Sequence, residues 1–234
     1  YAEEGVVVFN TPGANANSVK ELVLCALVMA SRNVLSAANW LRTLSPEEEI
    51  QKAAEQGKKK FVGSEIRGKS LGVIGLGAIG AEVANAASSL GMIVYGYDPY
   101  LSVNGAWRLS REIRHASSLA ELCEKSDFIS IHVPLTEKNP GLIGEKEIRS
   151  MKDGVILLNF SRDKLVDEQA MDRALREGKV RCYFSDFANP VSMGMEHAVI
   201  TPHLGASTEE AEENCAVMAV KELMDSRPPG HHVL

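Results

Sequence analysis

The sequence predicts a doubly wound α/β domain, with a parallel sheet covered by helices on both faces. From residue 70 onward, short apolar runs alternate with amphipathic helical stretches. The runs are largely apolar and do not alternate strictly with polar residues, which indicates strands that are covered on both faces. The expected strands are 71–74, 93–97, 128–131, 155–158, 180–184 and 198–200. The expected helices are 78–90, 119–125, 145–151, 167–177 and 207–224.

The region before residue 70 has a different pattern. Residues 6–9 form a short apolar run followed by a turn at 10–13, and a helix is expected over 18–44. That helix is apolar on almost every face, so it must be covered all round. Either a partner subunit covers part of it, in a homodimer, or the chain buries it alone. Ser45 and Glu48 predict a capping box for the next helix, which Gly57 ends before a solvated lysine run. Ser207 and Glu210 predict another for the last helix.

Composition excludes several classes of function. The chain has 234 residues, 25 Lys and Arg against 31 Asp and Glu, a net charge of −6 and a pI near 5.6. This balance argues against nucleic acid or an anionic membrane as the main partner. The longest apolar run, 22–30, is too short to span a bilayer, and no export leader is recognisable. Four scattered cysteines without a Cys-x-x-Cys pair predict reduced thiols, no metal and a cytoplasmic location. We expect one domain over 1–225 and a linker over 226–234.

A glycine loop follows the first expected strand of the sheet. Gly75, Gly77 and Gly80 are spaced as Gly-x-Gly-x-x-Gly, between a strand and a helix. The first glycine permits a tight turn, the second lets the backbone approach a pyrophosphate, and the third allows close packing of helix on strand. The helix N-terminus offers free N–H groups to the phosphates. Asp98 closes the second strand, where a carboxylate binds ribose hydroxyls and repels a 2′-phosphate. The sequence therefore predicts NAD rather than NADP, and a turn without ligand is the alternative.

Ligands in such sheets bind beyond the carboxyl ends of the strands, where Arg162 and His203 are expected. Arg162 can hold a substrate carboxylate with two hydrogen bonds. His203 can take a hydroxyl proton as hydride leaves, since its ordinary pKa lies near working pH. Taken alone, each has an ordinary alternative, a surface ion pair or a loop histidine. His132 also ends a strand and is expected to shape the cofactor pocket.

These residues, in this order, resemble the D-isomer-specific 2-hydroxyacid dehydrogenases, and within them the D-3-phosphoglycerate dehydrogenases. The resemblance runs from Gly5 to about Lys221 and rests on residues 10–21, 75–80, 132–134, 159–162 and 201–208. It implies oxidation of 3-phosphoglycerate by NAD as the entry step of serine biosynthesis, with Arg162 binding substrate, His203 as acid and base, and a dimer formed through the first helix. The cofactor site implied by motif and resemblance together comprises Gly75, Gly77, Ala78, Ile79, Gly80, Asp98, Pro99, His132, Val133, Pro134, Phe160, Ser161, Arg162, Asp186, His203 and Gly205.

The sequence departs from that family in three respects. Asn189 stands where a Glu usually orients the histidine, so Asp186 or Glu196 could replace that Glu. Asp163 follows the arginine in place of the usual Gly. The substrate domain that begins the family's chains has no counterpart here, nor does the C-terminal regulatory domain. We therefore expect the chain to bind NAD and to turn over poorly by itself.

Two other functions remain open at this point. One is a different NAD-dependent 2-hydroxyacid dehydrogenase, acting on glycerate or a lactate-like acid. The other is an NAD-sensing interaction protein, similar to the corepressors related to this family. The loss of the usual Glu favours the second, whereas the retained Arg162 and His203 favour an enzyme.

Overall fold

The computed structural model describes residues 8, 10–45 and 49–225. The predicted architecture is confirmed: the sheet has seven parallel strands in the order β3-β2-β1-β4-β5-β6-β7. The order reverses between β1 and β4, which makes their carboxyl ends the expected ligand crevice. The strands are β1 Ser70–Ile74, β2 Ile93–Tyr97, β3 Arg114–His115, β4 Phe128–Ile131, β5 Val155–Asn159, β6 Val180–Ser185 and β7 Ala198–Ile200.

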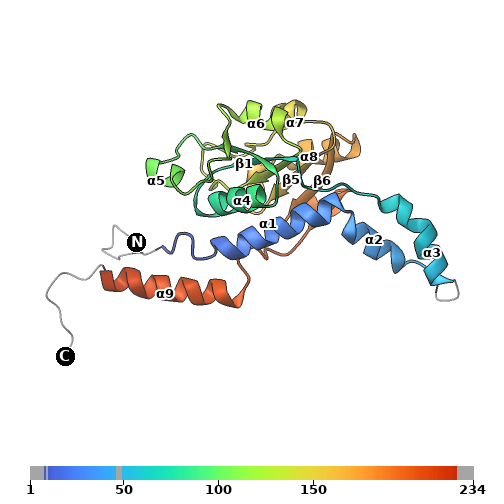
Figure 1. Cartoon of the computed structure of the whole chain (residues 1–234), viewed down its shortest axis with the longest axis horizontal. Coiled ribbons are helices and arrows are strands. Elements are labelled where there is room, and N and C mark those ends of the chain that lie inside the picture. Colours follow the sequence, from blue (N-terminus) through green and yellow to red (C-terminus); the bar gives the residue numbers. More distant parts are fainter. Residues whose placement is uncertain (1–7, 9, 46–48, 226–234) are drawn as a thin grey trace.

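Helices cover both faces of the sheet (Figure 1). The α1 and α4 helices pack on one face, while α6, α7 and α8 pack on the other. The helices are α1 Ala16–Ser31, α2 Val34–Leu41, α3 Ile50–Gly57, α4 Ala78–Ser89, α5 Val103–Ala106, α6 Leu119–Lys125, α7 Glu145–Ser150, α8 Glu168–Arg176 and α9 Glu209–Asp225. Short 3₁₀ helices occupy Lys58–Phe61, Asp163–Leu165 and Ser192–Gly194.

The single helix expected over 18–44 is wrong, because the chain forms two helices there. Asn33 adopts a left-handed conformation, with φ of 53°, and separates α1 from α2. Asparagine tolerates this conformation better than most residues. The cover of α1 is also one-sided: Val23 and Leu27 are buried, whereas Val28 is 44% exposed.

Beyond the bend, α2, α3 and the 3₁₀ helix Lys58–Phe61 form an arm that extends away from the sheet (Figure 1). The arm packs largely on itself. The Trp40 and Phe61 rings lie 5.3 Å apart, and Gly57 leaves room for the Trp40 ring, which a Cβ would meet at 2.0 Å. The lysine run is exposed, as expected, and Lys60 Nζ lies 5.6 Å from the centre of the Trp40 ring.

Two predicted helix starts differ from the structure. The α3 helix begins at Ile50 with Glu49 as its N-cap, so Ser45 does not cap it. The remaining residues of that expected capping box, and the expected strand over 6–9 except Val8, lie outside the described residues. In α9 the cap is Thr208, whose hydroxyl accepts the Ala211 N–H at 3.1 Å, instead of Ser207. Thr208 therefore caps α9 in place of Ser207, the residue that the capping-box spacing predicted.

No single helix among the described residues is both long and apolar enough to cross a membrane. The α1 and α2 helices reach that composition only as a pair, and they are bent by 64° relative to each other. All four cysteines are free thiols. Burial raises the pKa of Cys123 and of Cys182 to about 11, so both thiols stay protonated near neutral pH.

Candidate active site

The glycine loop joins β1 to α4 by the tight turn that its sequence predicts. Gly75 has a φ of +88°, and a Cβ there would lie 2.7 Å from the carbonyl oxygen of His132. A Cβ on Gly80 would lie 1.9 Å from the carbonyl oxygen of Gly75. Both positions therefore require glycine for structural reasons, and α4 begins directly against the end of its strand.

The middle glycine of the loop has no such structural requirement. A Cβ on Gly77 would meet nothing within 4 Å, and its φ of −67° suits any residue. Gly77 precedes the N-terminus of α4, where amide N–H groups lack helical partners. An open cradle beside free donors fits a pyrophosphate, so the chemistry of this loop matches the predicted dinucleotide.

Asp98 is held at the edge of this cradle by two backbone amides. Its Oδ2 accepts the N–H of Leu76 at 2.9 Å, and its Oδ1 accepts the N–H of Tyr100 at 2.9 Å. These bonds fix the carboxylate at the end of β2 and at the start of the glycine loop. Each oxygen retains acceptor capacity for a ribose hydroxyl.

A pocket of about 220 Å³ lies beside the loop, at the carboxyl ends of β4 to β7. The structure brings ten of the predicted site residues to this pocket, and the other six, Gly75, Gly77, Ala78, Gly80, Asp98 and Pro99, lie in the adjoining loop and after β2. The pocket is lined by Asn15, Val19, Ile79, His132, Val133, Pro134, Phe160, Ser161, Arg162, Asp186, His203, Gly205 and Ala206.

Three of these lining residues were not predicted: Asn15, Val19 and Ala206. All three lie inside the segments that carry the family resemblance. Their side chains have no acid, base or charge, so chemistry alone does not single them out. The segment that precedes and enters α1 reaches the site from a distant part of the sequence, and only the fold reveals that contact.

The arginine loop is fixed by a buried side chain at the end of β5. The Asn159 amide donates to the carbonyl oxygen of Arg162 at 2.9 Å and to the Tyr183 hydroxyl at 3.3 Å, and its oxygen accepts the Ser161 N–H at 3.2 Å. Ser161 also donates its hydroxyl to the carbonyl oxygen of Val133. The Arg162 backbone is therefore held firmly, while its guanidinium is exposed toward solvent and donates to the Ser161 carbonyl at 2.6 Å.

The carboxylate that follows the arginine does not pair with it. Asp163 accepts the backbone N–H of Lys164 at 2.7 Å, inside the 3₁₀ turn. This bond holds the extra negative charge in the turn, so the Arg162 guanidinium remains available to an incoming carboxylate.

His203 and Asp186 lie together at the ends of β7 and β6. The backbone N–H of His203 donates to the backbone carbonyl oxygen of Asp186 at 2.8 Å. The His203 imidazole packs on the Phe187 ring, with ring centres 5.0 Å apart. Asp186 is 1% exposed. Burial raises the pKa of the Asp186 carboxyl, while the Gly205 N–H and the charges of His203 and Arg162 act in the opposite direction.

The structure favours one of the two replacements considered for the missing Glu. Asn189 accepts the N–H groups of Val191 and Ser192, both at 2.9 Å, and donates to Glu168. Its side chain thus organises a turn. Glu196 is exposed at the amino end of β7, opposite the end that leads to His203. Asp186 is therefore the carboxylate placed beside the histidine.

His132 forms part of the pocket wall as a neutral group. Its Nε2 and the Ser130 hydroxyl are hydrogen-bonded at 2.8 Å, and burial lowers the pKa of its imidazole to about 4. A histidine that stays neutral near pH 7 lines the pocket without adding charge to it. His115 and His197 are exposed. Within the described residues, no group of three or more His, Cys, Asp or Glu side chains could hold a metal ion.

Comparisons with known proteins agree with this geometry. Residues 26–205 match the family model of the D-isomer specific 2-hydroxyacid dehydrogenase, NAD binding domain. The chain is 38% identical, over 94% of its length, to a D-3-phosphoglycerate dehydrogenase of Methanocaldococcus jannaschii, and 36% identical, over 94%, to a hydroxypyruvate reductase of Thermotoga maritima. It covers 41% of the first relative and 70% of the second.

A solved structure shows the same arrangement. The apo form of Rhodotorula graminis D-mandelate dehydrogenase superposes with a TM-score of 0.83 at 26% identity, covering 100% of this chain and 71% of that one. The glycine loop, the acidic residue after β2 and the family match together identify the cofactor as NAD. The chain belongs to the D-isomer specific 2-hydroxyacid dehydrogenase family, as its NAD-binding domain.

Proposed function

We propose that this chain provides the cofactor-binding and proton-transferring part of an enzyme that oxidises 3-phosphoglycerate at C2 to 3-phosphohydroxypyruvate, in serine biosynthesis. The observation that carries the proposal is the convergence of Arg162, His203 and Asp186 on one pocket beside the glycine loop. The relatives named D-3-phosphoglycerate dehydrogenase support the choice of substrate. The chain spans 41% of the length of each of those two relatives.

The residues of the loop and pocket each have a task in this proposal. Gly77 and the first turn of α4 bind the pyrophosphate, and Asp98 binds the adenosine ribose. When bound, NAD accepts a hydride from C2 of the substrate. Phe160, Val133 and the neutral His132 exclude water from the nicotinamide side of the pocket.

Arg162 and His203 act on the substrate. The Arg162 guanidinium binds the C1 carboxylate with two hydrogen bonds and orients C2. His203 accepts the proton of the C2 hydroxyl as the C–H electron pair leaves, so a carbonyl forms and an imidazolium remains. The Asp186 carboxylate stabilises that imidazolium, in place of the usual Glu. The proton then passes to solvent.

The cofactor part of the proposal is tested by calorimetric titration of NAD and NADP. We expect NAD to bind and NADP to bind more weakly. Asp98→Asn keeps an acceptor for a backbone amide but removes the charge, and it should weaken NAD binding and narrow the difference from NADP. Asp153→Asn changes a carboxylate that is 92% exposed at the other end of the sheet and should leave both affinities unchanged.

The catalytic part is tested by following NAD reduction with 3-phosphoglycerate, D-glycerate and D-lactate, at an enzyme concentration that reveals a single turnover. His203→Gln and Arg162→Gln should each abolish reduction, whereas His115→Gln, at an exposed histidine, should not. Equal reduction of D-glycerate and 3-phosphoglycerate would assign a different 2-hydroxy acid. NAD binding that changes self-association without any turnover would favour an NAD-sensing interaction protein.

We also propose that the chain forms a homodimer through α1 and the arm. The supporting observation is a set of apolar side chains left exposed on these elements: Val28 at 44%, Val34 at 45%, Leu41 at 44% and Ile50 at 48%. Sedimentation analysis of Val34→Glu with Leu41→Glu tests this, and a monomer is expected. Val103→Glu, on α5, is the matched control at a side chain that is 74% exposed. A dimer unchanged by the double substitution would place the interface elsewhere.

A further inference from the structure

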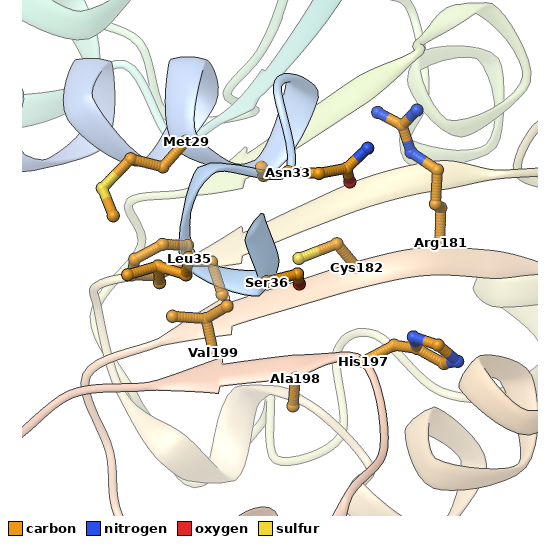
Figure 2. A pocket seen from close by; sticks show the side chains of 11 residues that line it. Met29, Asn33, Leu35, Ser36, Arg181, Cys182, His197, Ala198 and Val199 are labelled. Carbon is orange, nitrogen blue, oxygen red and sulfur yellow. The ribbon is translucent and has the colours of Figure 1, made fainter. Parts of the chain in front are cut away.

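A second cavity lies at the opposite end of the sheet from the NAD site (Figure 2). It has a volume of about 210 Å³, is open to solvent on one side, and lies between the α1–α2 bend and the strands β6 and β7. Nothing in the proposed reaction uses this cavity. It shares no lining residue with the pocket that holds Arg162 and His203.

The cavity is apolar at one end and carries an arginine at the other. Met29, Leu35 and Val199 lie together on one side in Figure 2, while Arg181 and His197 lie on the other. No Asp or Glu lines the cavity, although the chain carries a net charge of −6. The Arg181 guanidinium makes no ion pair or hydrogen bond within the part of the chain that the structure describes. An unpaired guanidinium at the rim of a cavity is available to bind an anion.

The backbone at this cavity is held in an unfavourable conformation at two places. Asn33 has φ of 53° and His197 has φ of 62°, and these are the two non-glycine residues with positive φ among those described. Both line this cavity: Asn33 lies at the α1–α2 bend, and His197 directly precedes β7. Backbone strain of this kind gathers at ligand-binding sites, where the surrounding structure holds it. The Asn33 amide donates to the carbonyl oxygens of Phe61 and Val62, at 3.5 and 3.4 Å, whereas His197 lies on the same side of the cavity as Arg181 in Figure 2.

We propose that this cavity binds a small organic anion: a carboxylate with a short branched apolar body and no ammonium group. Arg181 binds the carboxylate, and Met29, Leu35 and Val199 contact the apolar body. An amino acid is disfavoured because no carboxylate of the protein faces its ammonium. The volume is below the roughly 300–1,000 Å³ of pockets that hold drug-sized molecules, so the ligand is small. Binding would brace the bend from which the arm extends.

Isovalerate is the probe we would titrate, with amide chemical shifts of the labelled chain as the readout. We expect saturable shifts at Leu35, Cys182 and Val199. Isovaleramide, which has the same shape without the charge, and leucine, which adds an ammonium, should each bind at least about tenfold more weakly, since a charge-assisted hydrogen bond is lost or opposed. Arg181→Gln should have a similar effect, because it removes the charge that binds the carboxylate.

Two control variants separate this site from others. Arg111→Gln changes an exposed arginine that does not line the cavity and should bind isovalerate normally. Arg162→Gln removes the proposed substrate arginine and should also leave these shifts intact, so a failure of the proposed function would not be confused with a failure here. Undiminished binding in Arg181→Gln, equal binding of isovaleramide, or no saturable shifts would overturn the proposal. Chemical shift changes that depend on protein concentration and not on isovalerate would also overturn the proposal, because a second copy of the chain would then cover the cavity.

Discussion

Asp186 accepts the backbone N–H of Gly205 through one carboxylate oxygen, at 3.1 Å, and its other oxygen is buried without a partner among the described residues. The ionised form of Asp186 therefore destabilises the folded state, because burial raises the pKa of this carboxyl. A raised pKa in the folded state means that stability falls as pH rises above the ordinary value for Asp. Near neutral pH the full penalty applies.

Asp186→Asn should therefore stabilise the ligand-free protein while it impairs turnover. The amide oxygen can still accept the Gly205 N–H, and the buried charge is gone. We expect a gain of about 1 kcal/mol, the lower end of the cost of an unpaired buried polar group, or about 2–4 °C in Tm. Thermal unfolding near pH 7 measures this. Asp163→Asn, at the less buried carboxyl beside the arginine, is the control; a lower Tm for Asp186→Asn would contradict the argument.

Alanine at two glycines of the loop should separate cofactor binding from folding. A Cβ at position 77 meets nothing within 4 Å, so Gly77→Ala should fold normally and lose NAD affinity, because the methyl group occupies the cradle. A Cβ at position 80 would lie 1.9 Å from the Gly75 carbonyl oxygen. Gly80→Ala should therefore lower the free energy of unfolding by about 1–3 kcal/mol or more. Denaturant unfolding and NAD titration of both variants check this, and equal losses of stability would refute it.

The pH dependence of stability should contain a contribution from His132. Its imidazole takes up a proton at a pKa of about 4 in the folded chain and about 6.5 in the unfolded chain. The unfolded state therefore binds more protons between these values, and stability falls as pH drops through this window, by up to about 3 kcal/mol. His132→Gln should flatten the curve between pH 4 and 6.5, whereas His115→Gln should not. Denaturant unfolding across that range is the measurement.

A network at the amino ends of β1 and β4 should be a strong determinant of stability. Asp127 accepts the N–H and hydroxyl of Ser70 at 2.8 and 2.7 Å, and Lys152 Nζ lies 2.9 Å from its other oxygen. Burial acts to raise the pKa of Asp127, but these hydrogen bonds outweigh it and hold the pKa below its usual range. Asp127→Asn should cost about 1–3 kcal/mol in chemical unfolding. Asp153→Asn, an exposed ion-pair partner, should cost less than about 1 kcal/mol; similar losses would contradict this ranking.

The sheet was predictable because its strands are locally distinct. Runs such as 128–131 are short, largely apolar and bounded by polar residues, and the limits of this strand in the structure are the predicted ones. The β3 strand was missed because Arg114 and His115 are both exposed and polar, so its pairing with β2 leaves no hydrophobic signature. The helix over 18–44 was misjudged at Asn33, since a change in the sign of one φ does not interrupt the apolar pattern around it.

The residues of the candidate site also include some that the sequence could identify and some that it could not. The glycine loop, Asp98, Arg162 and His203 could be found because position after a strand and residue type together define their chemistry. The carboxylate near His203 could not be chosen, because Asp186 and Glu196 both lie near the position of the missing Glu in the sequence. In the folded chain Asp186 is buried near the histidine, the Asn189 side chain is hydrogen-bonded within a turn, and Glu196 lies at the opposite end of β7. None of these properties can be read from the sequence.

The arm beyond Asn33 has a consequence for the order in which the protein opens. The contact between the Trp40 and Phe61 rings is internal to the arm. Three hydrogen bonds join the end of the arm to the end of α1 and the bend. The Ser64 N–H donates to the Ser31 carbonyl oxygen at 3.0 Å, and the Asn33 amide donates to the carbonyl oxygens of Phe61 and Val62 at 3.5 and 3.4 Å. We therefore expect the arm to unfold as a separate cooperative unit of low stability. Its amide protons should exchange with solvent by subglobal unfolding, long before those of the seven strands.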